Sequence, residues 1–170
     1  MRERNLCFSP SLFLLLNSSN FVKLFKKTVE KVIKLKNLFE KGVGFRTFIL
    51  NQSHENRAKF MKQYIPLEIR AVYKERLSKQ QHKVYILGVI EGESSDSQQL
   101  LAVIEKLIST SQNIELRLIS AADTRALEKT PVFVFMNEDF SKEHYFTKNC
   151  KEAANEELIE ELLNIIEETT

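Results

Sequence analysis

The stretch that decides the fold is KVYILGVIEGESSDSQQLLAVI, residues 83–104. Val84–Ile90 is a continuous apolar run, which predicts a strand buried on both faces. A polar loop, Glu91–Ser97, follows, and Asp96 or Ser97 is of a type that caps a helix. The next apolar residues recur at helical spacing: Leu100, Leu101, Ile104, Leu107 and Ile108. The strand-to-helix corner is a candidate site, because a helix N-terminus presents free backbone N–H groups.

The residues after this corner predict a small mixed sheet. Ile114–Ile119 reads as a second strand, whose alternation favours one exposed face or an edge position. A strand, a helix and a strand form a right-handed crossover, so these two strands are expected to be parallel. The remaining elements are expected in this order: a segment of at most two helical turns at 121–129, a strand at 132–136, an antiparallel hairpin strand at 143–146 and a helix at about 152–167.

The residues before the corner predict helices. Apolar residues recur at helical spacing from Phe21 to Phe39, lysines fill much of the remainder, and Gly42 and Gly44 end the segment. Such a basic amphipathic helix could bind a membrane or enter a partner's groove. We favour the simpler interpretation, in which its apolar stripe packs on its own domain or on a second copy. Further helical segments are expected at 55–64 and 67–79.

The charge is distributed unevenly along the chain. Residues 1–83 hold 18 Lys and Arg against 6 Asp and Glu, and residues 84–170 hold 7 against 17. A basic half could attract nucleic acid, anionic lipid or an acidic partner. We favour the alternative in which basic helices pack beside the acidic half and the charges partly cancel, and we expect no nucleic-acid partner.

The N-terminus and the cysteines indicate in which cellular compartment the protein is expected. Arg2 and Arg4 precede the apolar run 6–16, which loosely resembles a signal peptide, but Pro10 interrupts the run and no small-residue cleavage site follows. We expect residues 1–20 to form a flexible or loosely docked tail. Cys7 and Cys150 are the two cysteines, too few for a disulfide framework or a metal cluster. A reducing, cytoplasmic location is the plain expectation.

Four motifs in order resemble a known family. They are Glu91–Ser97, Asn113–Leu118, the Thr130-Pro131 pair with its apolar strand, and the turn Asn137–Asp139. Together they resemble the thioredoxin fold, and most closely a bacterial and archaeal branch with a helical N-terminal extension and a redox loop E-D-W-C-G-D-C. The fold implied is α/β, a three-layer arrangement of about four strands in a mixed sheet flanked by helices. The resemblance covers roughly residues 42–168 and divides the chain into a tail (1–20), a helical extension (21–82) and a thioredoxin-like domain (83–170).

The chain departs from that family at the residues that carry its chemistry. Ser94 and Ser97 fall on the two cysteine positions, and Glu93 takes the place of the Trp before them. Disulfide exchange needs a thiolate and a second thiol, and a hydroxyl supplies neither. An acyl-transfer role for Ser94 would need a nearby base, and no histidine lies close in sequence. The three histidines, His54, His82 and His144, lack metal-ligand spacing.

The function expected is therefore binding without redox chemistry. We expect no catalytic residues, no cofactor and no metal, with a protein or peptide partner or a homodimer. If the resemblance holds, Pro131 is cis and leaves the Thr130 backbone free to pair with an extended peptide. The expected binding residues are Ser94, Ser95, Asp96, Ser97, Thr130 and Pro131. The alternative is a thiol- or glutathione-linked oxidoreductase that uses Cys150 or a partner's thiol.

Overall fold

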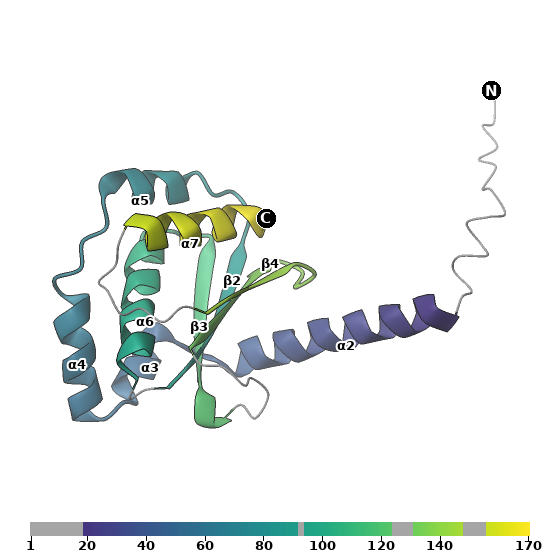
Figure 1. Cartoon of the computed structure of the whole chain (residues 1–170), viewed down its shortest axis with the longest axis horizontal. Helices are drawn as coiled ribbons and strands as arrows, with labels where there is room; N and C mark the ends of the chain where they lie inside the picture. Colours follow the sequence, from purple (N-terminus) through teal and green to yellow (C-terminus); the bar gives the residue numbers. More distant parts are fainter. Residues whose placement is uncertain (1–18, 92–93, 124–130, 148–155) are drawn as a thin grey trace. The chain divides into compact units, whose positions relative to one another are not determined.

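The structure is a computed structural model of the chain, and it describes residues 19–91, 94–123, 131–147 and 156–170. Residues 1–18 of the expected tail, Glu93, Thr130 and Cys150 lie outside these residues, as does most of the short helix expected at 121–129; the last two residues of the expected tail begin the first helix instead. The elements run in the order α2 (Ser19–Lys41), β1 (Val43–Gly44), α3 (Phe45–Leu50), α4 (His54–Tyr64), α5 (Ala71–Ser78), β2 (Val84–Ile90), α6 (Ser95–Ile108), β3 (Ile114–Ser120), the 3-10 turn η1 (Ala121–Asp123), β4 (Val132–Asn137), β5 (Glu143–Phe146) and α7 (Glu156–Glu168) (Figure 1).

The sheet has five strands in the order β1-β3-β2-β4-β5. β2 and β3 are parallel, and Val84 lies beside Ile114 in the register. β4 runs antiparallel to β2, and β5 antiparallel to β4. The parallel pair and the hairpin were both predicted from the sequence, so the fold class, a mixed α/β sheet of the thioredoxin type, is confirmed.

The core is built around β2 and α6. Val84, Ile86 and Ile90 of β2 belong to one buried cluster with the apolar side of α6, and alternate residues of β3 and β4 join them. α4, α5, α6 and α7 lie on this side of the sheet (Figure 1). The opposite face carries Tyr85, whose ring stacks on Phe140 at 5.1 Å between centroids. β2 is therefore covered on both faces, as its continuous apolar sequence requires.

Two elements were missed, and one helix begins later than predicted. β1 has two residues and pairs antiparallel with β3, and α3 follows it directly where the two glycines predicted only a helix end. β1 adds a fifth strand, so β3 does not lie at the edge of the sheet, and its alternating pattern marks a partly exposed face, which was the other alternative of the prediction. α5 begins at Ala71, four residues later than the expected segment, since Pro66 and the residues after it form no helix.

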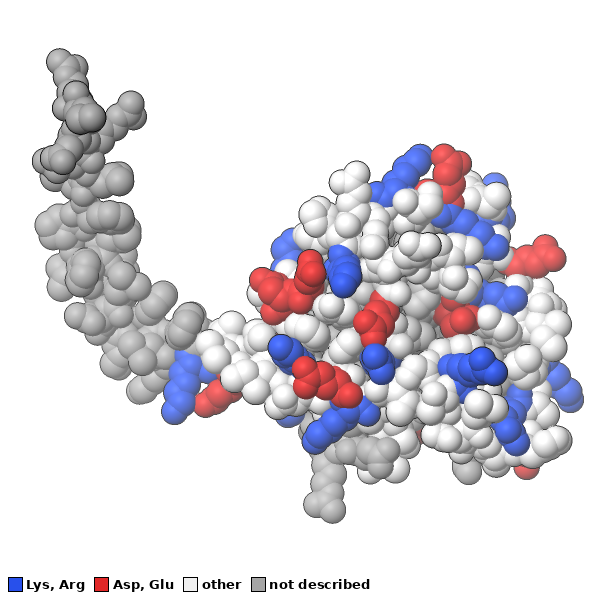
Figure 2. Space-filling model, turned by 180° about the vertical axis from the view of Figure 1, so that it is seen from behind, with Lys and Arg blue, Asp and Glu red and all other residues white. Residues whose placement is uncertain are grey.

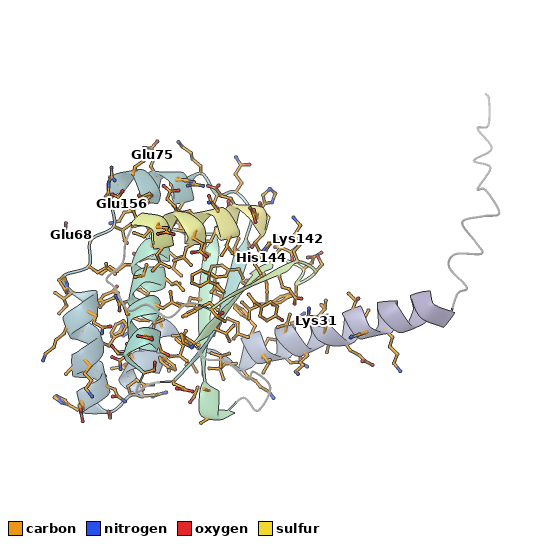
Figure 3. The ribbon with its side chains drawn as sticks, viewed as in Figure 1. Lys31, Glu68, Glu75, Lys142, His144 and Glu156 are labelled. Carbon is orange, nitrogen blue, oxygen red and sulfur yellow. The ribbon has the colours of Figure 1, made fainter. Side chains whose placement is uncertain are left out.

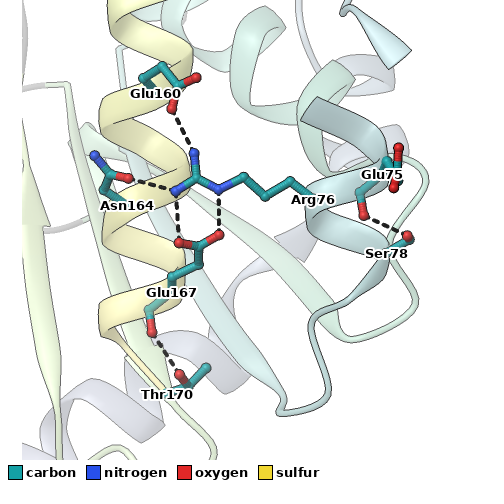
Figure 4. Close-up of polar contacts among 7 residues, drawn as sticks. All are labelled: Glu75, Arg76, Ser78, Glu160, Asn164, Glu167 and Thr170. Carbon is teal, nitrogen blue, oxygen red and sulfur yellow. Dashed lines mark hydrogen bonds and ion pairs between the residues drawn. The ribbon is translucent and has the colours of Figure 1, made fainter. Parts of the chain in front are cut away.

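The charges of the two halves do partly cancel, as expected, through α5 and α7. Arg76 of α5 donates to Glu167 at 2.6 and 2.8 Å and to Glu160 at 2.6 Å (Figure 4). It also donates to Asn164 at 2.7 Å, and Arg70 pairs with Glu156. The hydrogen bond to Glu167 is the first cause of the raised pKa of Arg76 and of the lowered pKa of Glu167. Acidic and basic side chains are also interspersed over the face seen in Figure 2.

α2 is confirmed as one continuous helix of 23 residues. The chain divides into two compact units within this helix, the first ending at Leu35 and the second beginning at Lys36. No helix in the described part of the chain is long and apolar enough to cross a membrane.

Candidate functional site

Ser94 begins the corner between β2 and α6. Its backbone N–H donates to the Glu91 carbonyl at 3.2 Å, which closes a turn directly after the strand. Its side-chain oxygen accepts from the Ser97 N–H at 3.3 Å and makes Ser94 the N-cap of α6. The sequence prediction that Asp96 or Ser97 caps this helix was wrong. All three residues are of capping type, and the turn that follows β2 decides among them.

Ser97 lies one turn into α6 and is completely buried, at 0% exposure. Its hydroxyl oxygen has no hydrogen-bond partner in the described structure. A buried hydroxyl without a partner costs free energy, whereas a thiol or a methyl group at the same place does not. The position therefore suits a small apolar group or a thiol better than the serine that occupies it.

The free donors of the corner are fewer than the sequence predicted. Ser94 accepts hydrogen bonds from two of these N–H groups. Its side-chain oxygen accepts from the Ser97 N–H, and its backbone carbonyl accepts from the Gln98 N–H at 3.1 Å. Within the described residues this leaves the N–H groups of Ser95 and Asp96 at the start of α6. Ser95 is exposed and Asp96 is half-buried. The Asp96 carboxylate already places a negative charge at the helix N-terminus, so the corner is better suited to a neutral carbonyl oxygen than to a free anion.

Pro131 lies at the same end of the sheet as this corner. Val132, the first residue of β4, pairs with Val89 of β2, so the antiparallel register places Pro131 level with Ile90. Pro131 is buried. Of the predicted binding residues, Ser94, Ser95, Asp96, Ser97 and Pro131 are described, and the register brings Pro131 to the strand end from which the loop to Ser94 departs.

The histidines do not come together with the corner. His144 lies on β5 and pairs with Phe135, which in turn pairs with Ile86, four residues before the end of β2 (Figure 3). At about 3.3 Å per residue that offset is roughly 13 Å along the strands. His82 precedes β2 and so lies at the opposite end of the sheet. Among the described residues no group of three or more His, Cys, Asp and Glu could hold a metal ion.

Two grooves are found away from the corner. One, of about 590 Å³, lies between α5 and α7 and is lined by the ion pairs of Arg70 and Arg76. The other, of about 330 Å³, lies among the last turns of α2, the first residues of β2, the middle of β3 and the turn after β4. In the second, Phe39 and Phe140 lie beside Tyr85, and Phe140 adopts a φ of 60°. Neither groove was predicted, because each joins residues far apart in the sequence.

Comparison with solved structures gives the fold. A crystal structure of a protein of unknown function from Pseudomonas aeruginosa has a TM-score of 0.65 and 22% identity, and the match covers 78% of this chain and 96% of that one. The crystal structure of an HIV epitope scaffold has a TM-score of 0.64 and 22% identity, over 79% of this chain and 98% of that one. No curated protein matches the sequence significantly.

Comparison with protein families shows to which family the chain is related. The family described as thioredoxin matches residues 42–162, from the residue before β1 to the middle of α7. This range contains the corner, the paired strands and Pro131. The chain belongs to the thioredoxin family.

Proposed function

We propose that this protein is a redox-inactive binding module, whose corner between β2 and α6 binds an extended segment of a protein or peptide partner. The observation that carries the proposal is the state of the two serines. The Ser94 oxygen is occupied as the helix cap, and Ser97 is fully buried. Neither residue offers a nucleophile to a substrate.

Binding is supported by what remains at the corner. The N–H groups of Ser95 and Asp96 can donate to a peptide carbonyl, and Pro131 lies at the same end of the sheet, directly before β4. An extended peptide pairs through its backbone, so it needs few specific side chains at the site. A second copy of this chain is one form that such a partner could take.

The redox half of the proposal is tested by insulin reduction. The wild-type protein should show no turnover above the dithiothreitol background. The variant S94C/S97C should gain turnover, because it restores two thiols at the cap and first-turn positions of α6. Turnover by the wild-type protein that disappears in Cys150→Ala would instead establish the thiol-linked oxidoreductase and overturn the proposal.

The binding half is tested by selecting peptides from a random display library on the wild-type protein. Ser95→Trp fills the corner with a bulky side chain and should lower the affinity of the selected peptides at least about tenfold. Ser109→Trp is the matched control, because Ser109 is also exposed but caps the other end of α6. Peptides that bind all three proteins equally, or a library that yields none, would count against a peptide site at this corner.

A further inference from the structure

The middle of α2 is basic and carries exposed apolar side chains. Val29 and Ile33 are 38% and 52% exposed, and they lie four residues apart on one side of the helix. The sequence alone favoured packing of this stripe against protein. An apolar pair that stays exposed on one side of a basic helix leaves that side available to a lipid surface.

Lysines occupy the opposite side of the same helix. Lys27, Lys31 and Lys34 follow the spacing of one helical face, with Glu30 at its border, whereas Lys26 lies on the side of Val29 and Ile33; all five charged residues are exposed. Figure 3 labels Lys31 on α2. Over its whole length α2 holds seven lysines against two glutamates and has no arginine. A predominantly positive face, with valine and isoleucine on the other side of the helix, is the pattern of a helix that lies in a membrane interface.

The composition of α2 distinguishes between partner classes. A nucleic-acid site would gain from arginine, whose planar guanidinium binds phosphates and bases in pairs, and would have no use for Val29 and Ile33. Lysine is a compact point charge on a flexible stem, which suits the diffuse negative charge of a lipid headgroup layer. Arg76 of α5 and Arg70 directly before it, by contrast, form ion pairs with glutamates of α7.

We propose that α2 binds the surface of an anionic lipid bilayer, with Val29 and Ile33 directed into the acyl boundary and the lysines at the headgroups. Both parts of the helix surface contribute to the affinity. Apolar burial supplies a salt-independent part, and each lysine near an anionic leaflet contributes roughly a fivefold gain. This proposal is independent of the corner at α6.

The test is co-sedimentation of the full chain with phosphatidylcholine vesicles, with and without phosphatidylserine, at low and high salt. The wild-type protein should bind the vesicles that contain phosphatidylserine and be largely released by salt. Replacing four lysines of α2 by glutamine should lower the partition coefficient at least about 100-fold. These lysines are Lys26, Lys27, Lys31 and Lys34.

Two matched controls test whether an effect depends on substitutions within α2 or would follow from the same substitutions anywhere on the surface. Four exposed lysines outside α2 (Lys59, Lys62, Lys79 and Lys83) replaced by glutamine remove the same charge and should leave binding within about twofold. V29Q/I33Q should lower binding about tenfold, whereas I65Q/V72Q, at exposed apolar residues elsewhere, should not. Circular dichroism of every variant checks that the helices are retained.

Several outcomes would overturn the proposal. They are equal binding to vesicles with and without phosphatidylserine, no binding to either, or the same loss in both lysine variants. Tighter binding to a generic oligonucleotide, insensitive to V29Q/I33Q, would assign α2 to nucleic acid instead. A monomer–dimer equilibrium that weakens in V29Q/I33Q, without vesicle binding, would assign the apolar stripe to a second copy.

Discussion

The two serines of the corner lie three residues apart, and their replacement by alanine should change the free energy of unfolding in opposite directions. Ser97→Ala removes a hydroxyl that is fully buried and has no hydrogen-bond partner in the described structure. Ser94→Ala removes the oxygen that accepts from the Ser97 N–H. The same chemical change therefore removes a cost at one position and a stabilising bond at the other.

The magnitude for Ser97→Ala follows from three contributions. Relief of the unsatisfied hydroxyl is worth about 1–3 kcal/mol. The higher helix propensity of alanine adds about 0.5 kcal/mol. The space left by one oxygen, roughly 10–15 Å³, costs about 0.3 kcal/mol. We expect a net stabilisation of about 1–3 kcal/mol, which raises Tm by about 3–9 °C for a chain of this size.

The magnitude for Ser94→Ala is set by the cap. Loss of a serine N-cap costs about 0.5–2 kcal/mol, and the 3.3 Å length of this hydrogen bond places it in the lower half of that range. We expect a destabilisation of about 0.5–1 kcal/mol.

The assay is urea unfolding followed by circular dichroism at pH 7, with equal m-values required of all variants. Ser109→Ala is the control, since Ser109 is exposed at the other end of α6 and its replacement should change stability by less than about 0.5 kcal/mol. If Ser97→Ala lowers the free energy of unfolding by more than about 1 kcal/mol, the hydroxyl has a partner in solution. Ser97 could then no longer be regarded as a buried hydroxyl without a partner.

Two further predictions concern stability. Arg76→Met should destabilise the protein by about 1 kcal/mol at pH 7, a value discounted for the partial exposure of the ion pairs, and Lys79→Met on the same helix should cost less. Arg76 lowers the pKa of Glu167 in the folded state, so the difference in the free energy of unfolding between wild type and Arg76→Met should have its full value above about pH 4.5. It should shrink as the pH falls through the folded-state pKa of Glu167. Urea unfolding across pH 3–7 measures this difference, and a difference that grows in acid would contradict the prediction. Gly88→Ala should cost about 1–2 kcal/mol in the same assay, because its Cβ would lie 2.7 Å from side-chain carbons of Leu118 and Phe133. Gly44→Ala, with nothing within 4 Å of the new Cβ, is the matched control and should be neutral, and an equal loss in both variants would refute the packing argument.

The elements that could be predicted are those with strong local patterns. Val84–Ile90, the apolar side of α6 and the hairpin of β4 and β5 were confirmed, because strand and helix periodicities are written in the residues themselves. β1 was missed because a strand of two residues has no periodicity. Its pairing with β3 joins Val43 to Leu118, which are 75 positions apart in the sequence. α3 was missed because Gly42 and Gly44 were interpreted only as the end of the preceding helix.

The sequence by itself determined the fold class and the order of the elements after Lys83, because these depend on residue type and local spacing. Tertiary structure decided which serine caps α6, that the hydroxyl of Ser97 is buried without a partner, and that Pro131 lies level with Ile90. It also decided that Arg76 lies against Glu160 and Glu167 of α7. Burial, register and pairing between distant segments arise only when the chain packs, so a single sequence contains the groups but not their distances.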